Sequence, residues 1–239
     1  MTSTATSAGV RKRPHEEASR ADDVLIIAGK PYRFPRRATA EEARRLGDAS
    51  DVKLEYVGGT LYAMVGGSPA LARIGANISG ELRDALKETD CTVSNSDLKV
   101  ASDARGHREV IYPDCVVVCG GDLLPADDWQ AVTNPALIVE VLSPSTELRD
   151  RTEKFELVRN LASLREYVLV SQDRACVERF YHNGREWVFS ATIGLDAAVT
   201  FESLAVTLPM SEIYLKIEFP PEEPVEETNG EQETPPPTP

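Results

Sequence analysis

The alternation of apolar and polar positions along the chain predicts a mixed series of helices and strands. Thr39-Ala-Glu-Glu42 is a capping-box pattern, which predicts a short helix that ends near Gly47. Residues 69–87 carry apolar side chains every three or four positions, and this spacing predicts a longer helix. Further helices are expected over residues 150–162 and 210–214.

Runs of β-branched and aromatic residues between turn residues predict the strands. Hairpin turns are expected at Gly58-Gly59, near the N-terminus, and at Asn183-Gly184, near the C-terminus. Residues 120–134 are expected to form a loop. The predicted strands cover residues 53–57, 60–65, 91–100, 110–119, 136–142, 166–171, 176–181, 186–190 and 206–208. This order predicts an α/β (α+β) fold with a mixed sheet.

Composition divides the 239 residues into one folded domain, residues 24–219, and two tails. Residues 1–22 are polar, and residues 221–239 are acidic and rich in proline, so both are expected to be disordered. No apolar run approaches the roughly 20 residues of a membrane span. The N-terminus also lacks the apolar core of a secretory signal, so no membrane partner is expected.

The net charge of −13 argues against a broad nucleic-acid-binding surface. The last 19 residues hold six glutamates and no lysine or arginine, so the rest of the chain carries −7. Any nucleic-acid site in such an acidic domain must be local, or assisted by a metal ion.

The four cysteines are interpreted as buried free thiols. Cys115 and Cys119 flank three valines on a predicted strand. Four residues along a strand span about 13 Å, which is too far for one disulfide or one zinc ion. Unpaired thiols favour a reducing location, and we therefore expect a cytoplasmic protein.

Two carboxylates lie on strongly apolar predicted strands. Glu140 lies within ALIVEVL, and Asp114 precedes a run of three valines. A buried carboxylate is costly unless something pairs with it. Two carboxylates on neighbouring strands could hold a hard divalent cation, which prefers oxygen ligands. A buried salt bridge to an arginine explains the pattern equally well.

The segment after this strand adds a lysine. Asp150-Arg-Thr-Glu153 fits a second capping box, so a helix is expected to begin at Asp150. Lys154 would then lie in the first turn, where a cation opposes the helix dipole. A lysine near two carboxylates and a metal could orient an attacking water, although an exposed helix lysine is also consistent with the pattern.

Several motifs resemble the Uma-two family of restriction endonucleases, within the PD-(D/E)xK nuclease superfamily. They are LEYVGGTLYAMVGGSP at 54–69, YPDCVVV at 112–118, PALIVEVLSPST at 135–146 and RDRTEKFELVRNLASLREYVLV at 149–170. They occur in the expected order, and the resemblance covers roughly residues 36–190. It implies a restriction-endonuclease-like fold, in which helices flank a central mixed sheet.

The resemblance also implies a metal-dependent phosphodiesterase site. Its motif residues fall on Glu55, Asp114, Glu140 and Lys154. The superfamily lysine usually stands at the position of Leu142, but in this family it has moved to the following helix. The implied metal ligands are Asp114, Glu140 and the backbone carbonyl of Val141.

The implied function is hydrolysis of phosphodiester bonds, with Mg²⁺ or Mn²⁺ as cofactor, DNA as substrate, a homodimer as the assembly and no organic cofactor. Two positions depart from the family pattern. Gly58-Gly59 stands where members often have an aspartate, and Leu71 stands where many have a histidine. The alternative is a catalytically inactive interaction or regulatory protein that keeps the nuclease fold.

Overall fold

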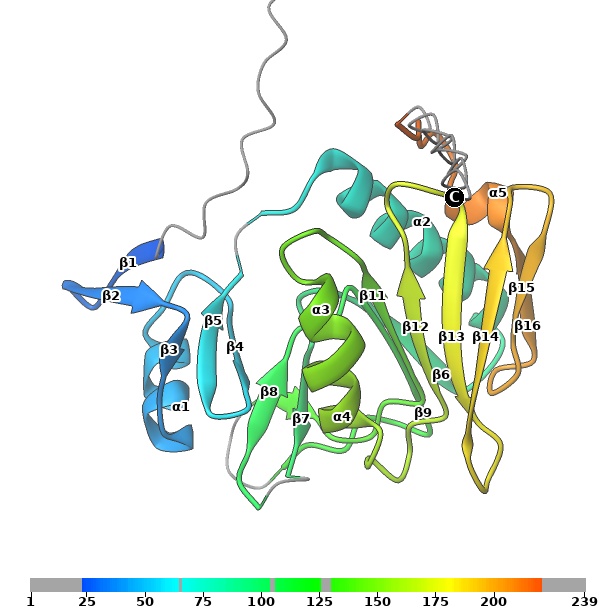
Figure 1. Cartoon of the computed structure of the whole chain (residues 1–239). Coiled ribbons are helices and arrows are strands. Elements are labelled where there is room, and N and C mark those ends of the chain that lie inside the picture. The colour runs from blue at the N-terminus through cyan, green and yellow to red at the C-terminus, as the bar shows by residue number, and fades with distance from the viewer. Residues whose placement is uncertain (1–22, 65, 104–105, 126–129, 221–239) are drawn as a thin grey trace, which may run out of the picture.

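A computed structural model describes residues 23–64, 66–103, 106–125 and 130–220 (Figure 1). The two tails that the sequence predicts to be disordered, 1–22 and 221–239, lie outside these residues. Within the described part of the chain, no helix is long and apolar enough to cross a membrane.

The larger part of the fold is a six-stranded mixed sheet. In spatial order it contains β14 (Trp187–Ile193), β13 (Cys176–His182), β12 (Glu166–Val170), β11 (Leu137–Val141), β9 (Cys115–Cys119) and β6 (Cys91–Asn95). Strands β11 and β12 are parallel, and the other pairs are antiparallel. The predicted hairpin at Asn183-Gly184 is confirmed as the connection between β13 and β14.

A second six-stranded sheet stands beside the first. Its order is β10 (Ala131–Val132), β7 (Lys99–Ser102), β8 (Glu109–Ile111), β4 (Leu54–Val57), β5 (Thr60–Ala63) and β3 (Arg36–Arg37). The predicted hairpin at Gly58-Gly59 joins β4 to β5, and both glycines have positive φ angles. Two separate hairpins are formed by β1 (Asp23–Ile27) with β2 (Lys30–Phe34), and by β15 (Ala198–Phe201) with β16 (Val206–Pro209).

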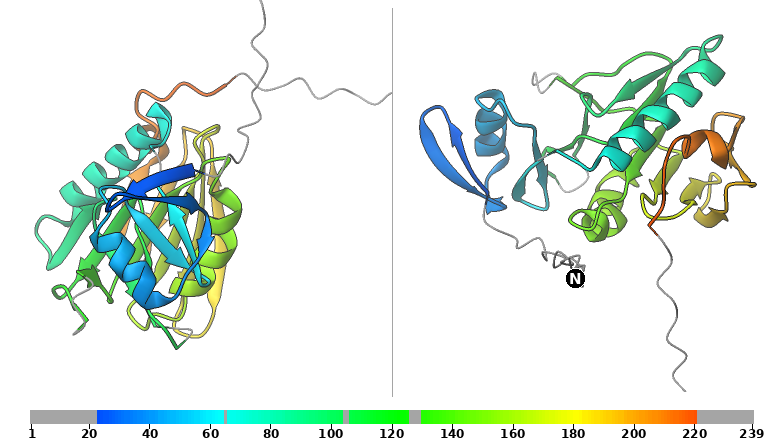
Figure 2. Two further views of the ribbon diagram at one scale, coloured as in Figure 1. Left: turned by 90° about the vertical axis from the view of Figure 1, so that its left-hand side faces the viewer. Right: turned by 90° about the horizontal axis from the view of Figure 1, so that it is seen from above.

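Helices cover both faces of the larger sheet, as Figures 1 and 2 show. On one face lies α2 (Pro69–Leu86), whose buried stripe of Ile74, Ile78 and Leu82 packs on β9 and β11. On the other face lies a continuous helical segment of α3 (Glu147–Arg149), η1 (Asp150–Lys154) and α4 (Phe155–Val158), in which η1 is π-helical. The predicted arrangement, a mixed sheet flanked by helices, is confirmed.

Two short helices complete the fold. The predicted helix start is confirmed, because the Thr39 hydroxyl accepts a hydrogen bond from the Glu42 amide at the start of α1 (Ala40–Asp48), but the Glu42 carboxylate pairs with Arg36. The predicted C-terminal helix is α5 (Met210–Ile213). Asn77 of α2 donates to the carbonyls of Ile213 and Leu215, and so ties α5 to α2.

Three predicted elements need correction. The strand expected over 91–100 is two strands, β6 and β7, in different sheets, since the chain turns at Asn95 to Leu98. The strand expected over 110–119 is interrupted by Tyr112 to Asp114 into β8 and β9. The third helix begins at Glu147 rather than at Asp150. Strands β1, β2, β3, β10 and β15 were not predicted, and β10 lies in the segment 120–134 that was expected to be a loop.

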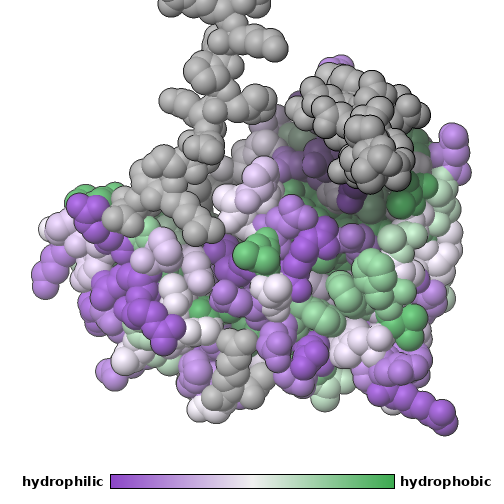
Figure 3. Space-filling view, viewed as in Figure 1, coloured by the Kyte–Doolittle hydropathy of each residue, from purple (hydrophilic) through white to green (hydrophobic). Residues whose placement is uncertain are grey.

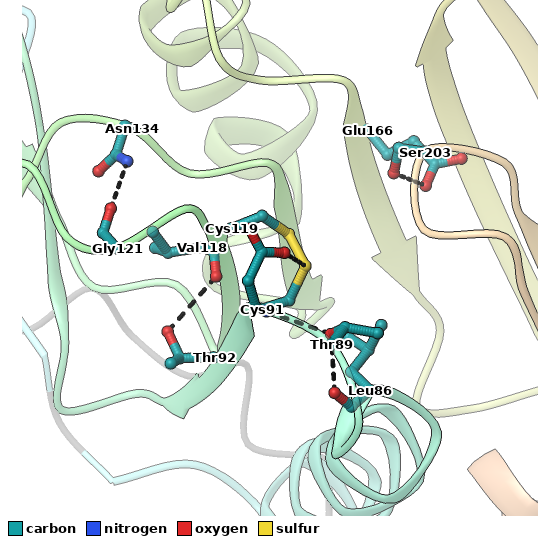
Figure 4. Close-up of a disulfide and its surroundings, with 11 residues drawn as sticks. Leu86, Thr89, Cys91, Thr92, Val118, Cys119, Gly121, Asn134, Glu166 and Ser203 are labelled. Atoms are coloured by element: carbon teal, nitrogen blue, oxygen red, sulfur yellow. Dashed lines mark hydrogen bonds between the residues drawn. A yellow bond between two sulfur atoms is a disulfide. The ribbon is translucent and has the colours of Figure 1, made fainter.

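The prediction that all four cysteines are free thiols is wrong for two of them. Cys91 and Cys119 stand opposite each other on the antiparallel strands β6 and β9, and they form a disulfide (Figure 4). Cys115 and Cys176 are free and buried, as expected. The inference of a reducing location therefore loses part of its basis, and a cytoplasmic location stays a prediction.

Candidate active site

Lys154 is the centre of a buried cluster of charged side chains. Its Nζ lies 3.0 Å from Glu55 Oε1, 3.0 Å from Glu140 Oε1 and 3.1 Å from Asp150 Oδ1. The exposed fraction of the Lys154 side chain is 3%, and the three carboxylates are equally inaccessible. We call these four residues the charged cage.

The cage is assembled from both sheets and from the helical segment. Glu55 comes from β4 in the smaller sheet, and Glu140 comes from β11 in the larger one. Asp150 and Lys154 are four residues apart in η1, so both side chains point from one face of the helix. Wide helical turns of this π type are frequent at functional sites.

The expected second capping box at Asp150 is wrong. Asp150 lies inside the helix, because Thr146 and Glu147 already begin it, and its backbone carbonyl accepts a hydrogen bond from the Tyr167 hydroxyl at 2.8 Å. Lys154 is therefore beyond the first turn and does not oppose the helix dipole there. Its position is explained by the three carboxylates around it.

Asp114 lies between β8 and β9, beside the end of β11. Its Oδ2 accepts a hydrogen bond from the Val141 amide at 2.7 Å, which joins the predicted metal ligands Asp114 and Val141. Gly75 of α2 is adjacent, since a Cβ at this glycine would lie 3.9 Å from Asp114 Cβ. Burial raises the pKa of Asp114 to about 6, although the Val141 amide and Lys154 act in the opposite direction.

The pKa shifts of Glu140 and Lys154 show that the carboxylates of the cage outweigh its one cation. Burial raises the pKa of Glu140 well above its ordinary value, and the Lys154 ammonium offsets only part of this rise. Burial alone would lower the pKa of Lys154. The carboxylates of Glu140, Glu55 and Asp150 outweigh burial and hold this pKa well above its usual range. Negative charge is therefore in excess at this site.

The balance of charge in and around the cage is compatible with a bound divalent cation. Four carboxylates (Glu55, Asp114, Glu140 and Asp150) face two cations, Lys154 and Arg149, whose Nη2 lies 3.3 Å from Glu55 Oε2. In the described residues, no group of three or more acidic, histidine or cysteine side chains is arranged to hold a metal ion. A site of two carboxylates, Asp114 and Glu140, completed by water, is nevertheless compatible with Mg²⁺, which keeps several of its waters.

The structure brings the sequence-predicted residues Glu55, Glu140 and Lys154 into direct contact, and it places Asp114 beside them. It also adds two residues to this set, Arg149 and Asp150. The spacing of Asp150 and Lys154, four residues apart, was a readable signal for an acid–base pair on one helix face. Nothing in the sequence pattern pointed to Arg149.

Three comparisons place the chain among known proteins. The family model Uma2, described as "Putative restriction endonuclease", matches residues 40–211, so the chain belongs to this family and the expected membership is confirmed. A crystal structure of a "putative nuclease belonging to DUF820" from Anabaena variabilis matches with a TM-score of 0.60 and 16% identity. The match covers 74% of this chain and 97% of that chain, and it supports the nuclease-like fold.

Two relatives come from Synechocystis sp. The uncharacterized protein slr1290 is 32% identical over 196 residues, which are 81% of this chain and the whole of the relative. The uncharacterized protein sll1609 is 28% identical over 169 residues, which are 70% of this chain and 94% of the relative. Neither name describes an activity.

Proposed function

We propose that this protein is a Mg²⁺-dependent endonuclease that hydrolyses phosphodiester bonds in DNA, with Mn²⁺ as a possible substitute. The observation that carries the proposal is the excess of buried carboxylates around Lys154, with the raised pKa of both Asp114 and Glu140. A buried excess of negative charge is stable when a cation completes it. Membership of a nuclease family agrees with this chemistry.

Asp114, Glu140 and the carbonyl of Val141 would hold the ion. A bound Mg²⁺ supplies a Lewis acid that polarises the phosphate and lowers the pKa of a water. The Val141 amide orients one oxygen of Asp114, and Lys154 orients one oxygen of Glu140. Glu55 holds Lys154 in place, and from the Glu140 side of the site the Lys154 ammonium would orient the attacking water and stabilise the negative charge that develops there.

The test is cleavage of plasmid DNA with Mg²⁺ or Mn²⁺ by the wild type and by the variants Asp114→Ala and Glu140→Ala. Both variants should lose at least about 100-fold in rate, because each removes a charged group that acts in the transition state. Glu156→Ala is the matched control, since this carboxylate is exposed on α4 and should not affect cleavage. Equal rates in all four proteins would exclude the proposal.

A second candidate is an interaction or regulatory protein that keeps the nuclease fold without turnover. One observation favours it, namely that the Lys154 ammonium itself lies within 3.1 Å of three carboxylates. Such a protein would bind no Mg²⁺ through Asp114 and Glu140, and calorimetry would show this directly.

A homodimer would allow a nuclease of this kind to cut both strands of a duplex. We propose this assembly from the family resemblance alone. Light scattering on the purified full chain should give about twice the monomer mass of 26.2 kDa, and a monomer mass at all concentrations would refute it.

A further inference from the structure

Arg149 joins the charged cage to the protein surface. Its Nη2 lies 3.3 Å from Glu55 Oε2, and its guanidinium carbon lies 4.1 Å from the centre of the Tyr62 ring. Tyr62 and Glu55 are cross-strand partners in the hairpin of β4 and β5, so their side chains lie on the same face. Arg149 is thus held by a carboxylate and by an aromatic ring at once.

Exposure separates Arg149 from the four residues of the charged cage. The exposed fraction of its side chain is 17%, whereas that of Glu55, Glu140, Asp150 and Lys154 is between 0% and 4%. Arg149 is therefore the cation that an anion approaching from solvent meets first, and Lys154 lies deeper in the site.

The guanidinium still has hydrogen-bonding capacity. It carries five N–H donors in a flat fork, and a single Glu55 oxygen takes one of them in the described part of the protein. Its buried Nε has no hydrogen-bond partner among the described residues, and a buried donor left in this state is destabilising. The Tyr62 ring under the guanidinium carbon restricts where the fork can lie, and a held fork favours two-point contact with an oxyanion.

We infer that Arg149 binds a non-bridging phosphate oxygen of the nucleic-acid substrate at the entrance of the cage, and that Tyr62 positions its guanidinium. This inference rests on the proposed nuclease function and adds a substrate-binding residue to it. It would give an acidic domain a local contact to phosphate where a broad basic surface is absent.

The experiment measures binding of a fluorescein-labelled DNA duplex by anisotropy in EDTA, from 50 to 200 mM salt. Arg149→Ala should weaken binding at least about 10-fold, and it should reduce the slope of log K against log salt by about 0.9, the value for one lost phosphate contact. Arg149→Lys keeps the positive charge but lacks the planar guanidinium. Its affinity for the duplex should lie between that of the wild type and that of Arg149→Ala. Arg159→Ala, at an exposed arginine after α4, is the matched control and should change binding less than twofold.

Arg149 is largely buried, so Arg149→Ala could fail to fold. A second variant therefore tests the inference without changing Arg149. Tyr62→Leu leaves the Arg149–Glu55 pair intact and should weaken binding by a factor of about 3, since cation–π contacts contribute about 0.5–1 kcal/mol. Wild-type affinity and salt slope in Arg149→Ala would overturn the inference. If Arg149→Ala does not fold, wild-type values in both Arg149→Lys and Tyr62→Leu overturn it.

Cleavage assays separate this inference from the proposed function. A wild type that binds DNA with an Arg149-dependent salt slope but never cleaves it refutes only the nuclease activity. A wild type that cleaves, with an unchanged KM in Arg149→Ala, refutes only the role of Arg149. A wild type that neither binds nor cleaves DNA refutes both.

Discussion

Two buried glutamates on neighbouring parallel strands have opposite surroundings. Glu140 of β11 faces a cage in which carboxylates outnumber cations. Glu166 of β12 is also fully buried, but its oxygens accept hydrogen bonds from Arg179 at 2.8 Å and from the Glu202 amide at 3.0 Å. A third bond comes from the Ser203 hydroxyl at 2.6 Å (Figure 4). Each glutamate fits one of the two explanations that the sequence left open for a carboxylate on an apolar strand.

The comparison shows that burial alone does not identify a functional carboxylate. Burial raises the pKa of both glutamates, but at Glu166 three donors, one of them cationic, satisfy the carboxylate within the protein. At Glu140 the nearest cation is shared with two further carboxylates. This excess of carboxylates at Glu140 is the basis of the proposed cation site, and the following variants test the difference between the two glutamates.

Removal of Lys154 should have the largest effect. Lys154→Met leaves three buried carboxylates without their shared cation, so the free energy of unfolding should fall by about 3–5 kcal/mol in urea titrations. Arg44→Met, at an exposed pair with Asp48 on α1, is the control and should cost less than about 1 kcal/mol. A loss below 1 kcal/mol in Lys154→Met would mean that the cage is not charged as described.

Matched substitutions of the two glutamates should separate catalysis from stability. Glu140→Gln should reduce DNA cleavage at least about 100-fold while it keeps or raises stability in EDTA, because it removes a buried charge. Glu166→Gln should keep cleavage and lose about 1–3 kcal/mol of stability, because it weakens a satisfied network. The comparison fails if the two variants behave alike in both assays.

Asp114 should give a smaller effect, visible in the dependence of stability on pH. Its pKa of about 6 in the folded protein exceeds the ordinary value of about 3.9 in an unfolded chain. Between these values the folded state keeps a proton that the unfolded state has lost, so the contribution of Asp114 to stability falls as pH rises from about 4 to about 6.

The Asp114→Asn variant isolates this contribution in metal-free buffer. At pH 7.5 its free energy of unfolding should exceed that of the wild type by about 1–3 kcal/mol, and the difference should vanish near pH 4. The control Asp84→Asn removes an exposed carboxylate of α2 and should show no such trend. A constant difference between pH 4 and pH 7.5 would contradict the raised pKa.

The sequence predicted the main elements because their signals are local. The stripe of α2, the caps of α1 and the two glycine hairpins depend on neighbouring residues only. Glu140 was found because a carboxylate interrupts an apolar run. Glu166 was not, because it begins its strand after polar residues, and its partners Arg179 and Ser203 come from later parts of the chain.

The features that the sequence did not predict correctly share one physical cause. Each depends on contacts between residues that are brought together only by the tertiary fold. Cys91 and Cys119 become partners only because β6 and β9 pair in that register. Asp150-Arg-Thr-Glu153 satisfies the rule for a helix start, but the helix already begins at Glu147 and turns the same aspartate toward Lys154. Arg149 gains its role from a ring and a carboxylate on a distant hairpin.

The exposed surface over the helical segment does not reveal the charged cage. Figure 3 shows mostly hydrophilic residues on the face that carries the helical segment, with apolar side chains grouped toward β13 and β14. Phe189 and Ile193 of β14 belong to the exposed large apolar residues, at 55% and 72%. The side chains of the charged cage are buried below this surface, so the cage is identified by the contacts among them.

Calorimetric titration of Mg²⁺ and Mn²⁺ into the metal-free protein tests whether Asp114 and Glu140 form a metal site. The proteins to compare are the wild type, Asp114→Asn, Glu140→Gln and Glu166→Gln. Our account predicts saturable binding of one or two ions to the wild type and to Glu166→Gln, and none to the other two variants. Absence of binding to the wild type, or equal binding to all four proteins, would contradict a metal site between Asp114 and Glu140.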